Sequence, residues 1–86
     1  MPEIRYHHIS SAVVSVLPDR MHEILSKLPG LDGVEVYAAQ EGKIVIVIEG
    51  PSTGVLGDRL TRIALLDGVI SANMVYEHID EEVAET

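Results

Sequence analysis

The chain has 86 residues, and its 14 acidic against 6 basic side chains give a formal net charge of −8. This charge argues against nucleic-acid binding, because a duplex is bound by neutralising its phosphates with Lys and Arg. Apolar residues make up 47% and charged residues 23%, the balance of a chain that folds. A domain this small buries only about 60–65% of its unfolded surface, so there is little room for a deep, walled active site.

The chain contains no cysteine, which removes disulfides, thiolate catalysis and cysteine-based metal sites. Its N-terminus lacks the basic start and long apolar run of an export signal, and no apolar stretch approaches the roughly 20 residues that cross a bilayer. We therefore expect a cytoplasmic protein that is not inserted in a membrane. We expect residues 1–86 to form one domain, with flexible ends at 1–7 and 79–86.

The first half of the chain predicts a strand, a helix and a strand hairpin. Residues 9–17 mix β-branched with small polar side chains and stop at a proline, which is typical of a strand. An apolar stripe at helical spacing follows, formed by Met21, Ile24, Leu25 and Leu28. Alternation over 34–39 and 43–49 predicts two strands joined by a turn at Glu41-Gly42. The later of these strands is largely apolar on both faces, which favours a central place in the sheet.

The second half predicts one more helix and one more strand. Ser52 is expected to cap the helix, whose apolar side holds Leu56, Leu60, Ile63 and Ala64. Residues 69–78 predict the last strand, with its phase left open. The favoured phase turns Ala72, Met74 and Tyr76 to the core and Asn73, Val75 and Glu77 to the opposite side. A bulge would swap Asn73 and Val75 with Met74 and Tyr76. The acidic end that follows is expected to be a solvated tail.

An internal repeat supports this layout. Leu31-Asp32-Gly33-Val34 recurs as Leu66-Asp67-Gly68-Val69, each time after a predicted helix and at the start of a predicted strand. The chain thus consists of two strand-helix-strand halves. Two such halves joined by a hairpin predict an α+β, ferredoxin-like βαββαβ fold, in which a four-stranded antiparallel sheet carries both helices on one face.

The second face of such a sheet has no cover of its own. Strand alternation places valines and serines there, edged by glutamates, and a partly apolar exposed patch usually marks a partner site. The candidate binding residues are Ser11, Val13, Ser15, Val45, Val47, Glu49, Val75 and Glu77. A basic peptide with a hydrophobic stretch suits this surface, because guanidinium groups pair bidentately with carboxylates while apolar side chains cover the valines.

No catalytic or metal site is predicted. The four histidines, at positions 7, 8, 22 and 78, lack the spacing of zinc ligands. The serines of the first strand have no His or Lys placed by sequence to activate them. We therefore expect no enzyme activity, no metal and no cofactor.

Four segments together resemble the NapD family, the cytoplasmic assembly chaperones of the periplasmic nitrate reductase. They are HISSAVV (8–14), GVEV (33–36), GKIVIVIE (42–49) and Gly68-Val69 followed by Met74-Val75-Tyr76. The resemblance runs from about residue 8 to residue 80. It implies a protein that binds the twin-arginine signal peptide of the catalytic subunit NapA and restrains its export until the cofactors are in place.

A second family shares the expected fold. The amino-acid-binding regulatory domains of AsnC-type transcription regulators also have LPG-V-V and GV strand entrances, and they dimerise around a metabolite. Those domains usually follow a DNA-binding helix-turn-helix, for which this chain has no room.

Overall fold

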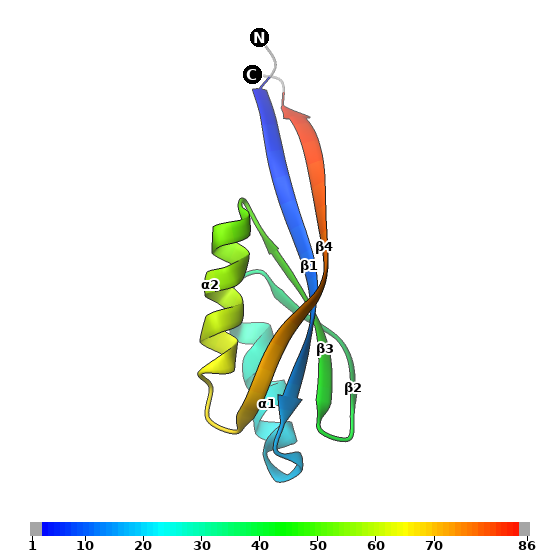
Figure 1. Ribbon diagram of the computed structural model, residues 1–86, viewed down its shortest axis with the longest axis vertical. Helices are drawn as coiled ribbons and strands as arrows, with labels where there is room; N and C mark the ends of the chain where they lie inside the picture. Colours follow the sequence, from blue (N-terminus) through cyan, green and yellow to red (C-terminus); the bar gives the residue numbers. More distant parts are fainter. Residues whose placement is uncertain (1–2, 85–86) are drawn as a thin grey trace.

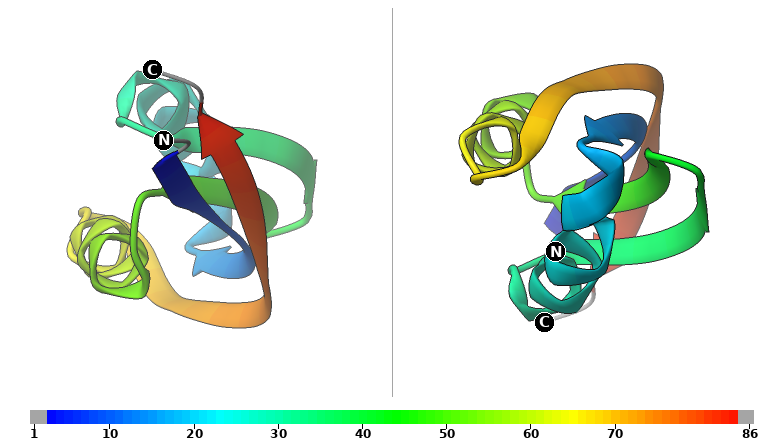
Figure 2. Two further views of the ribbon diagram at one scale, coloured as in Figure 1. Left: turned by 90° about the horizontal axis from the view of Figure 1, so that it is seen from above. Right: turned by 90° about the horizontal axis from the view of Figure 1, so that it is seen from below.

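The computed structural model describes the backbone of residues 3–84 and the side chains of residues 7–78. Its elements are β1 (Glu3–Val16), α1 (Met21–Lys27), β2 (Val34–Gln40), β3 (Lys43–Gly50), α2 (Thr53–Ala64) and β4 (Val69–Ala84). Short 3-10 turns at Pro18–Arg20 and Leu28–Gly30 flank α1. The strands form one antiparallel sheet in the order β2-β3-β1-β4, with both helices on the same face (Figures 1 and 2). The predicted ferredoxin-like α+β architecture is confirmed.

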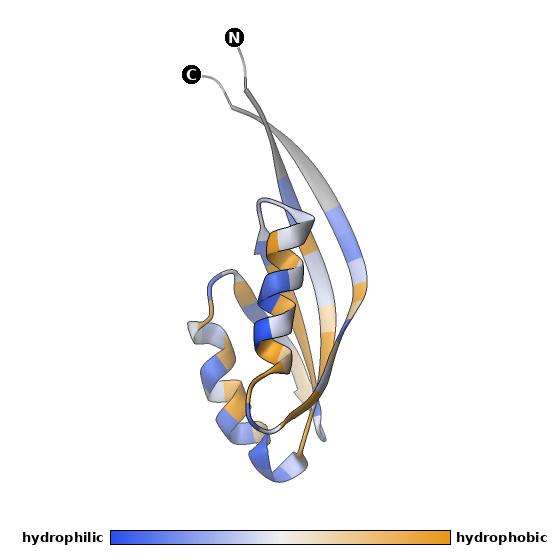
Figure 3. Cartoon of the chain, turned by 60° about the vertical axis from the view of Figure 1, so that its left-hand side comes forward, coloured by the Kyte–Doolittle hydropathy of each residue, from blue (hydrophilic) through white to orange (hydrophobic). Residues whose placement is uncertain are grey.

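The hydrophobic core lies between the helices and the sheet. Its fully buried members from the two central strands are Ala12, Val14, Ile44, Ile46 and Ile48. The helices add the buried side chains Ile24, Leu28, Leu56 and Ile63, and Figure 3 shows hydrophobic and hydrophilic segments alternating along each helix. Ala64 was predicted to join this stripe but is exposed. It lies one residue, or about 100° of rotation, beyond Ile63 at the end of α2.

The hairpin between β2 and β3 has the predicted two-residue turn. Glu41 and Gly42 both have positive φ, 40° and 81°, as a turn that matches the twist of the strands requires. Further along β2 the register passes from Val36 opposite Ile46 to Ala38 opposite Val45, so Tyr37 is an extra residue in a bulge. Regular alternation would place Ala38 on the same face as Val36. The bulge reverses the alternation and turns it to the other face of the sheet.

The two repeated segments form the same turn at the start of β2 and β4. The amide of Val34 donates to the carbonyl of Leu31 at 3.3 Å, and the amide of Val69 donates to that of Leu66 at 3.1 Å. The third residue of each repeat is a glycine with positive φ, 69° at Gly33 and 97° at Gly68. Each half of the chain therefore enters its final strand through an equivalent turn.

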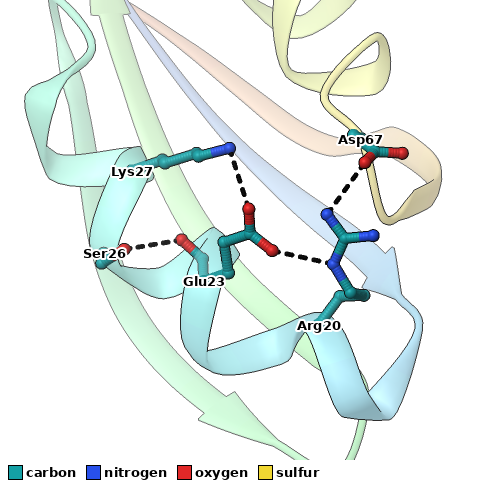
Figure 4. Close-up of polar contacts among 5 residues, drawn as sticks. All are labelled: Arg20, Glu23, Ser26, Lys27 and Asp67. Atoms are coloured by element: carbon teal, nitrogen blue, oxygen red, sulfur yellow. Dashed lines mark hydrogen bonds and ion pairs between the residues drawn. The ribbon is translucent and has the colours of Figure 1, made fainter.

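An arginine from the opposite half of the chain holds each of these turns. Arg20 donates from Nη2 to Asp67 Oδ2 at 2.9 Å and from Nε to Glu23 Oε2 at 2.8 Å (Figure 4). The hydrogen bond from Arg20 is the main reason that the pKa of Glu23 is lowered, and a second one from Lys27 adds to it. In the equivalent place Arg59 donates from Nη1 to the carbonyl of Asp32. The two halves are thus tied together reciprocally.

The first and last strands, β1 and β4, are longer than the sequence predicts. β1 begins at Glu3 and β4 ends at Ala84, and the register pairs them from Glu3 opposite Ala84 to His8 opposite Ile79. They extend beyond the helices as a two-stranded arm, which gives the molecule a long axis of 53 Å (Figure 1). That residues 1–7 and 79–86 are flexible and the tail solvated stays a prediction; residues 1–2 and 85–86 lie outside those that the structure describes.

Candidate functional site: the open face of the sheet

We call the side of the sheet opposite the helices the open face. Residues that are directly opposite on neighbouring antiparallel strands share a face, so the register identifies its members. The described side chains on this face are His7, Ile9, Ser11, Val13, Ser15, Glu35, Ala38, Gln40, Lys43, Val45, Val47, Glu49, Ser71, Asn73, Tyr76 and His78. Both helices lie on the other face, so no described element of the chain covers the open face (Figure 2).

The centre of the open face is a partly apolar floor. β1 and β3 place Ser11 opposite Val47 and Val13 opposite Val45, and all four side chains are half-buried against one another. Ser15 continues this row. The strand phase predicted for β1 and β3 is therefore confirmed, and the structure brings these five candidate residues together.

Two carboxylates lie at one end of this floor. Glu49 is opposite Ile9, and Glu35 of β2 is opposite Val47. The Glu49 side chain is 49% exposed, and its Oε2 lies 3.4 Å from Nε2 of His7. Glu35 is also exposed. This end of the open face can accept hydrogen bonds from a cationic group without burying either carboxylate.

A basic side chain lies at the opposite end. Lys43 is opposite Ser15, and its Nζ donates to Ser15 Oγ at 2.7 Å. Lys43 and Glu49 are six positions apart on β3, a distance of roughly 20 Å along the strand. Going from Glu49 to Lys43, the open face is therefore negative at the first end, apolar in the middle and positive at the second end.

A bulge in β4 changes the predicted edge of the site. Met74 is opposite Ala12, and Tyr76 is opposite Ser11, so Val75 between them has no partner. An extra residue reverses the alternation of everything after it. Tyr76 was predicted to face the core, and that prediction is wrong: it is 61% exposed and lies on the open face.

The same bulge moves Glu77 to the helix side of the sheet. Glu77 is opposite the buried Ser10, and its Oε1 accepts a hydrogen bond from Thr53 Oγ1 at 3.0 Å, at the start of α2. His8 Nδ1 lies 3.7 Å from the same oxygen. The prediction that Glu77 edges the open face is therefore wrong. Nothing in the composition of β4 marks Val75 as the bulged residue.

The remaining candidates of β4 keep their predicted exposure. Asn73 lies opposite Val13 on the open face, as the favoured phase predicts. Val75 itself is 61% exposed. The alternative, in which a bulge swaps Asn73 and Val75 with Met74 and Tyr76, is confirmed for the bulge and for the outward position of Tyr76. It is wrong for Asn73 and Met74, because Met74 packs against the core before the bulge begins.

A smaller hollow lies on the helix side, between α2 and the turn before β2. Its volume is about 270 Å³, and its lining includes Leu31, Val34, Val55, Asp58 and Arg62. Arg59 also lines it, but this guanidinium already holds the carbonyl of Asp32. The lining holds two acidic residues, Asp32 and Asp58, and two arginines, so the hollow has no net preference for the charge of a ligand.

The described side chains contain no group of three histidine, cysteine or acidic residues arranged to hold a metal ion. Within the same part of the chain, no helix has the length and apolarity that a membrane crossing needs. The open face is the candidate functional site.

The fold and this site define a small ferredoxin-like protein whose candidate functional surface is an uncovered sheet face. The family model described as "NapD protein" matches residues 7–81. The chain therefore belongs to the NapD family, and of the two families considered from the sequence the match favours this one.

Individual relatives agree with the family assignment. A protein of Paracoccus pantotrophus named "Chaperone NapD" is 44% identical over 77 residues, which are 90% of this chain and 69% of the relative. A "Chaperone NapD" of Haemophilus influenzae is 26% identical over 77 residues, 87% of this chain and 83% of the relative. The solution structure of the E. coli Tat proofreading chaperone protein NapD has the same fold, with a TM-score of 0.77 at 24% identity. That similarity covers 81% of this chain and 76% of the E. coli chain.

Proposed function

We propose that this protein is a cytoplasmic, non-enzymatic chaperone that binds the twin-arginine signal peptide of the nitrate reductase catalytic subunit NapA on the open face. Binding restrains the export of NapA until its cofactors have been inserted. The family assignment supports the chaperone role, because both named relatives are NapD chaperones. The signal peptide as ligand is supported by the chemistry of the open face.

The order of charges along the open face carries the proposal. A leader segment of this type begins with basic residues and continues with apolar ones. Glu49 and Glu35 lie at one end of a floor made by valines, and Lys43 lies at the other. We infer that the arginines bind at the Glu49 end and that the apolar segment runs over Val47 and Val45 toward Lys43. The opposite direction would bring the arginines next to a lysine.

The size of the floor fits such a segment. The roughly 20 Å from Glu49 to Lys43 correspond to about 13 residues of an α-helix or about 6 residues of extended chain. Helical peptides fill a groove with one apolar face, whereas an extended peptide would add to a sheet edge. Because the floor is formed by the face of central strands, it suits the helical form.

Calorimetric titration with the NapA signal peptide tests the proposal. We expect binding that weakens as salt rises, because part of the attraction is Coulombic and is screened over about 10 Å at 0.1 M ionic strength. A peptide in which both arginines are replaced by glutamine is expected to bind more weakly than the natural peptide at the same salt concentration. Absence of any binding by the wild-type protein would refute the proposed function.

A pair of aspartate substitutions tests the location. Val47→Asp places a charge in the middle of the floor, and we expect at least a tenfold loss of peptide affinity with the fold kept, because Val47 faces away from the core. Leu65→Asp is the matched control, since Leu65 is 79% exposed at the end of α2, on the helix side. Equal losses in both variants would rule out the open face as the site. Circular dichroism checks that each variant is folded.

A further inference from the structure

The bulge in β4 brings two planar side chains to the open face. Tyr76 lies opposite Ser11 and His78 opposite Ile9, so the two follow one another along the same edge. Their rings are nearly parallel, with an interplanar angle of 8° and centroids 6.5 Å apart. Without the bulge, the alternation would turn Tyr76 toward the helices.

The Tyr76 ring offers part of its face to a ligand. Two rings in face-to-face contact would lie about 3.5–4.0 Å apart, the contact distance of carbon atoms. The observed 6.5 Å lies within the range of offset-stacked pairs, so the His78 ring does not cover the whole face of Tyr76. Tyr76 is 61% exposed as a residue. A planar group can therefore stack on the Tyr76 ring.

The surrounding charge favours a cation at this place. Glu49 and Tyr76 lie on opposite sides of β1, where they are opposite Ile9 and Ser11. Their Cα atoms are therefore roughly 10–12 Å apart. Lys43 is at the far end of the face. Aromatic rings attract cations through their negative faces, and the effect adds to that of a nearby carboxylate.

We propose that Tyr76, supported by His78, forms an arginine-selective subsite of the open face. This inference rests on the proposed function and specifies which residue makes the site prefer arginine. The ring of Tyr76 binds one guanidinium by stacking, and Glu49 accepts hydrogen bonds from the guanidinium of the neighbouring arginine. Two adjacent arginines of the peptide thus each have a partner, Tyr76 on one side of β1 and Glu49 on the other.

The subsite distinguishes arginine from lysine by shape. A guanidinium is planar and weakly hydrated, so it stacks on an aromatic face while its edges remain free to donate hydrogen bonds. An ammonium is compact and strongly hydrated, and gains less from the ring. A site that depended on carboxylates alone would attract both side chains by charge.

The test compares two signal peptides of NapA, the natural one and one in which both arginines are lysines. Affinities are measured by calorimetry for the wild type, Tyr76→Leu and Tyr76→Phe. Tyr37→Leu is the matched control, because Tyr37 is also exposed at a bulge, but on the opposite edge of the sheet in β2.

We expect the wild type to bind the arginine peptide more tightly than the lysine peptide. Tyr76→Leu should weaken arginine-peptide binding by about two- to fivefold, the effect of an exposed cation–π contact, and lysine-peptide binding by less. Tyr76→Phe keeps the ring and should keep the preference, as should Tyr37→Leu.

The outcomes separate this inference from the proposed function. Binding of both peptides with the same preference in Tyr76→Leu as in the wild type would overturn the subsite and leave the chaperone role intact. Loss of the preference in Tyr76→Phe would also overturn it, because the ring face is unchanged there. A wild-type protein that binds neither peptide would end both proposals.

Discussion

Val75 determines which acidic side chains border the open face. As the extra residue of the β4 bulge it leaves Met74 on the core side and brings Tyr76 to the open face. Glu77 then points to the helix side, where it accepts a hydrogen bond from Thr53. Glu49, on a strand with regular pairing in this region, stays on the open face. Two glutamates that look equivalent in the sequence therefore have different surroundings and different expected roles.

Replacing each of these glutamates by glutamine tests the difference. Both changes remove one negative charge, so their long-range effects on a basic peptide are similar. Glu49→Gln should weaken peptide binding by about two- to fivefold, the range of an exposed ion pair, and should reduce its salt dependence. Glu77→Gln should change the affinity by less than about twofold, because only the distant field is altered. A larger loss of affinity in Glu77→Gln than in Glu49→Gln, measured by calorimetry, would mean that the arginines do not bind on the open face.

At the level of elements, the two Leu-Asp-Gly-Val turns set where β2 and β4 begin. Gly33 has φ of 69°, and a Cβ on it would lie 2.5 Å from the carbonyl oxygen of Glu49 and against the guanidinium of Arg59. The amide of Glu49 in turn donates to the carbonyl of Gly33 at 2.8 Å. This turn therefore also fixes the end of β3, where the acidic end of the open face is formed.

A pair of alanine substitutions tests the role of this turn. Gly33→Ala should lower the free energy of unfolding by about 1–3 kcal/mol, because alanine is strained at positive φ and its Cβ meets backbone. Gly57→Ala, within α2, meets no atom within 4 Å and should raise stability by about 0.5–1 kcal/mol. Chemical denaturation measures both. A neutral Gly33→Ala would mean that the turn does not require glycine.

For the whole molecule, the fold and the floor of the site were predictable because they depend on side chains that alternate regularly between the two faces of each strand. β3 is apolar on both faces, and its pairing with β1 has no irregularity, so each residue faces where its parity predicts. The edge strands were not predictable in the same way. β2 and β4 each contain a bulge, at Tyr37 and Val75, and an extra residue costs little on a strand that pairs on one side only. The sequence allowed a bulge in β4, but no pattern of apolar residues fixes its position, so only the structure shows that Tyr76 lies on the open face.

The length of the arm was also beyond the sequence pattern. Residues 79–84 are rich in acids, which favoured a solvated tail, yet their backbone pairs with residues 3–8. Strand pairing in this region depends on the partner strand, which a local reading of composition does not include. The floor, in contrast, lies on β1 and β3, the strands whose other face forms the core with the helices.

The most direct test of the central claim is a nuclear magnetic resonance titration of the isotope-labelled protein with unlabelled NapA signal peptide. We predict that the largest shifts occur in amides of β1 and β3 on the open face, around Ser11, Val45, Val47 and Glu49, while those of α1 and α2 remain nearly unchanged. A nitroxide on the N-terminus of the peptide should broaden signals near Glu49 and spare those near Lys43. Shifts confined to the helices, with the open face unaffected, would contradict the account.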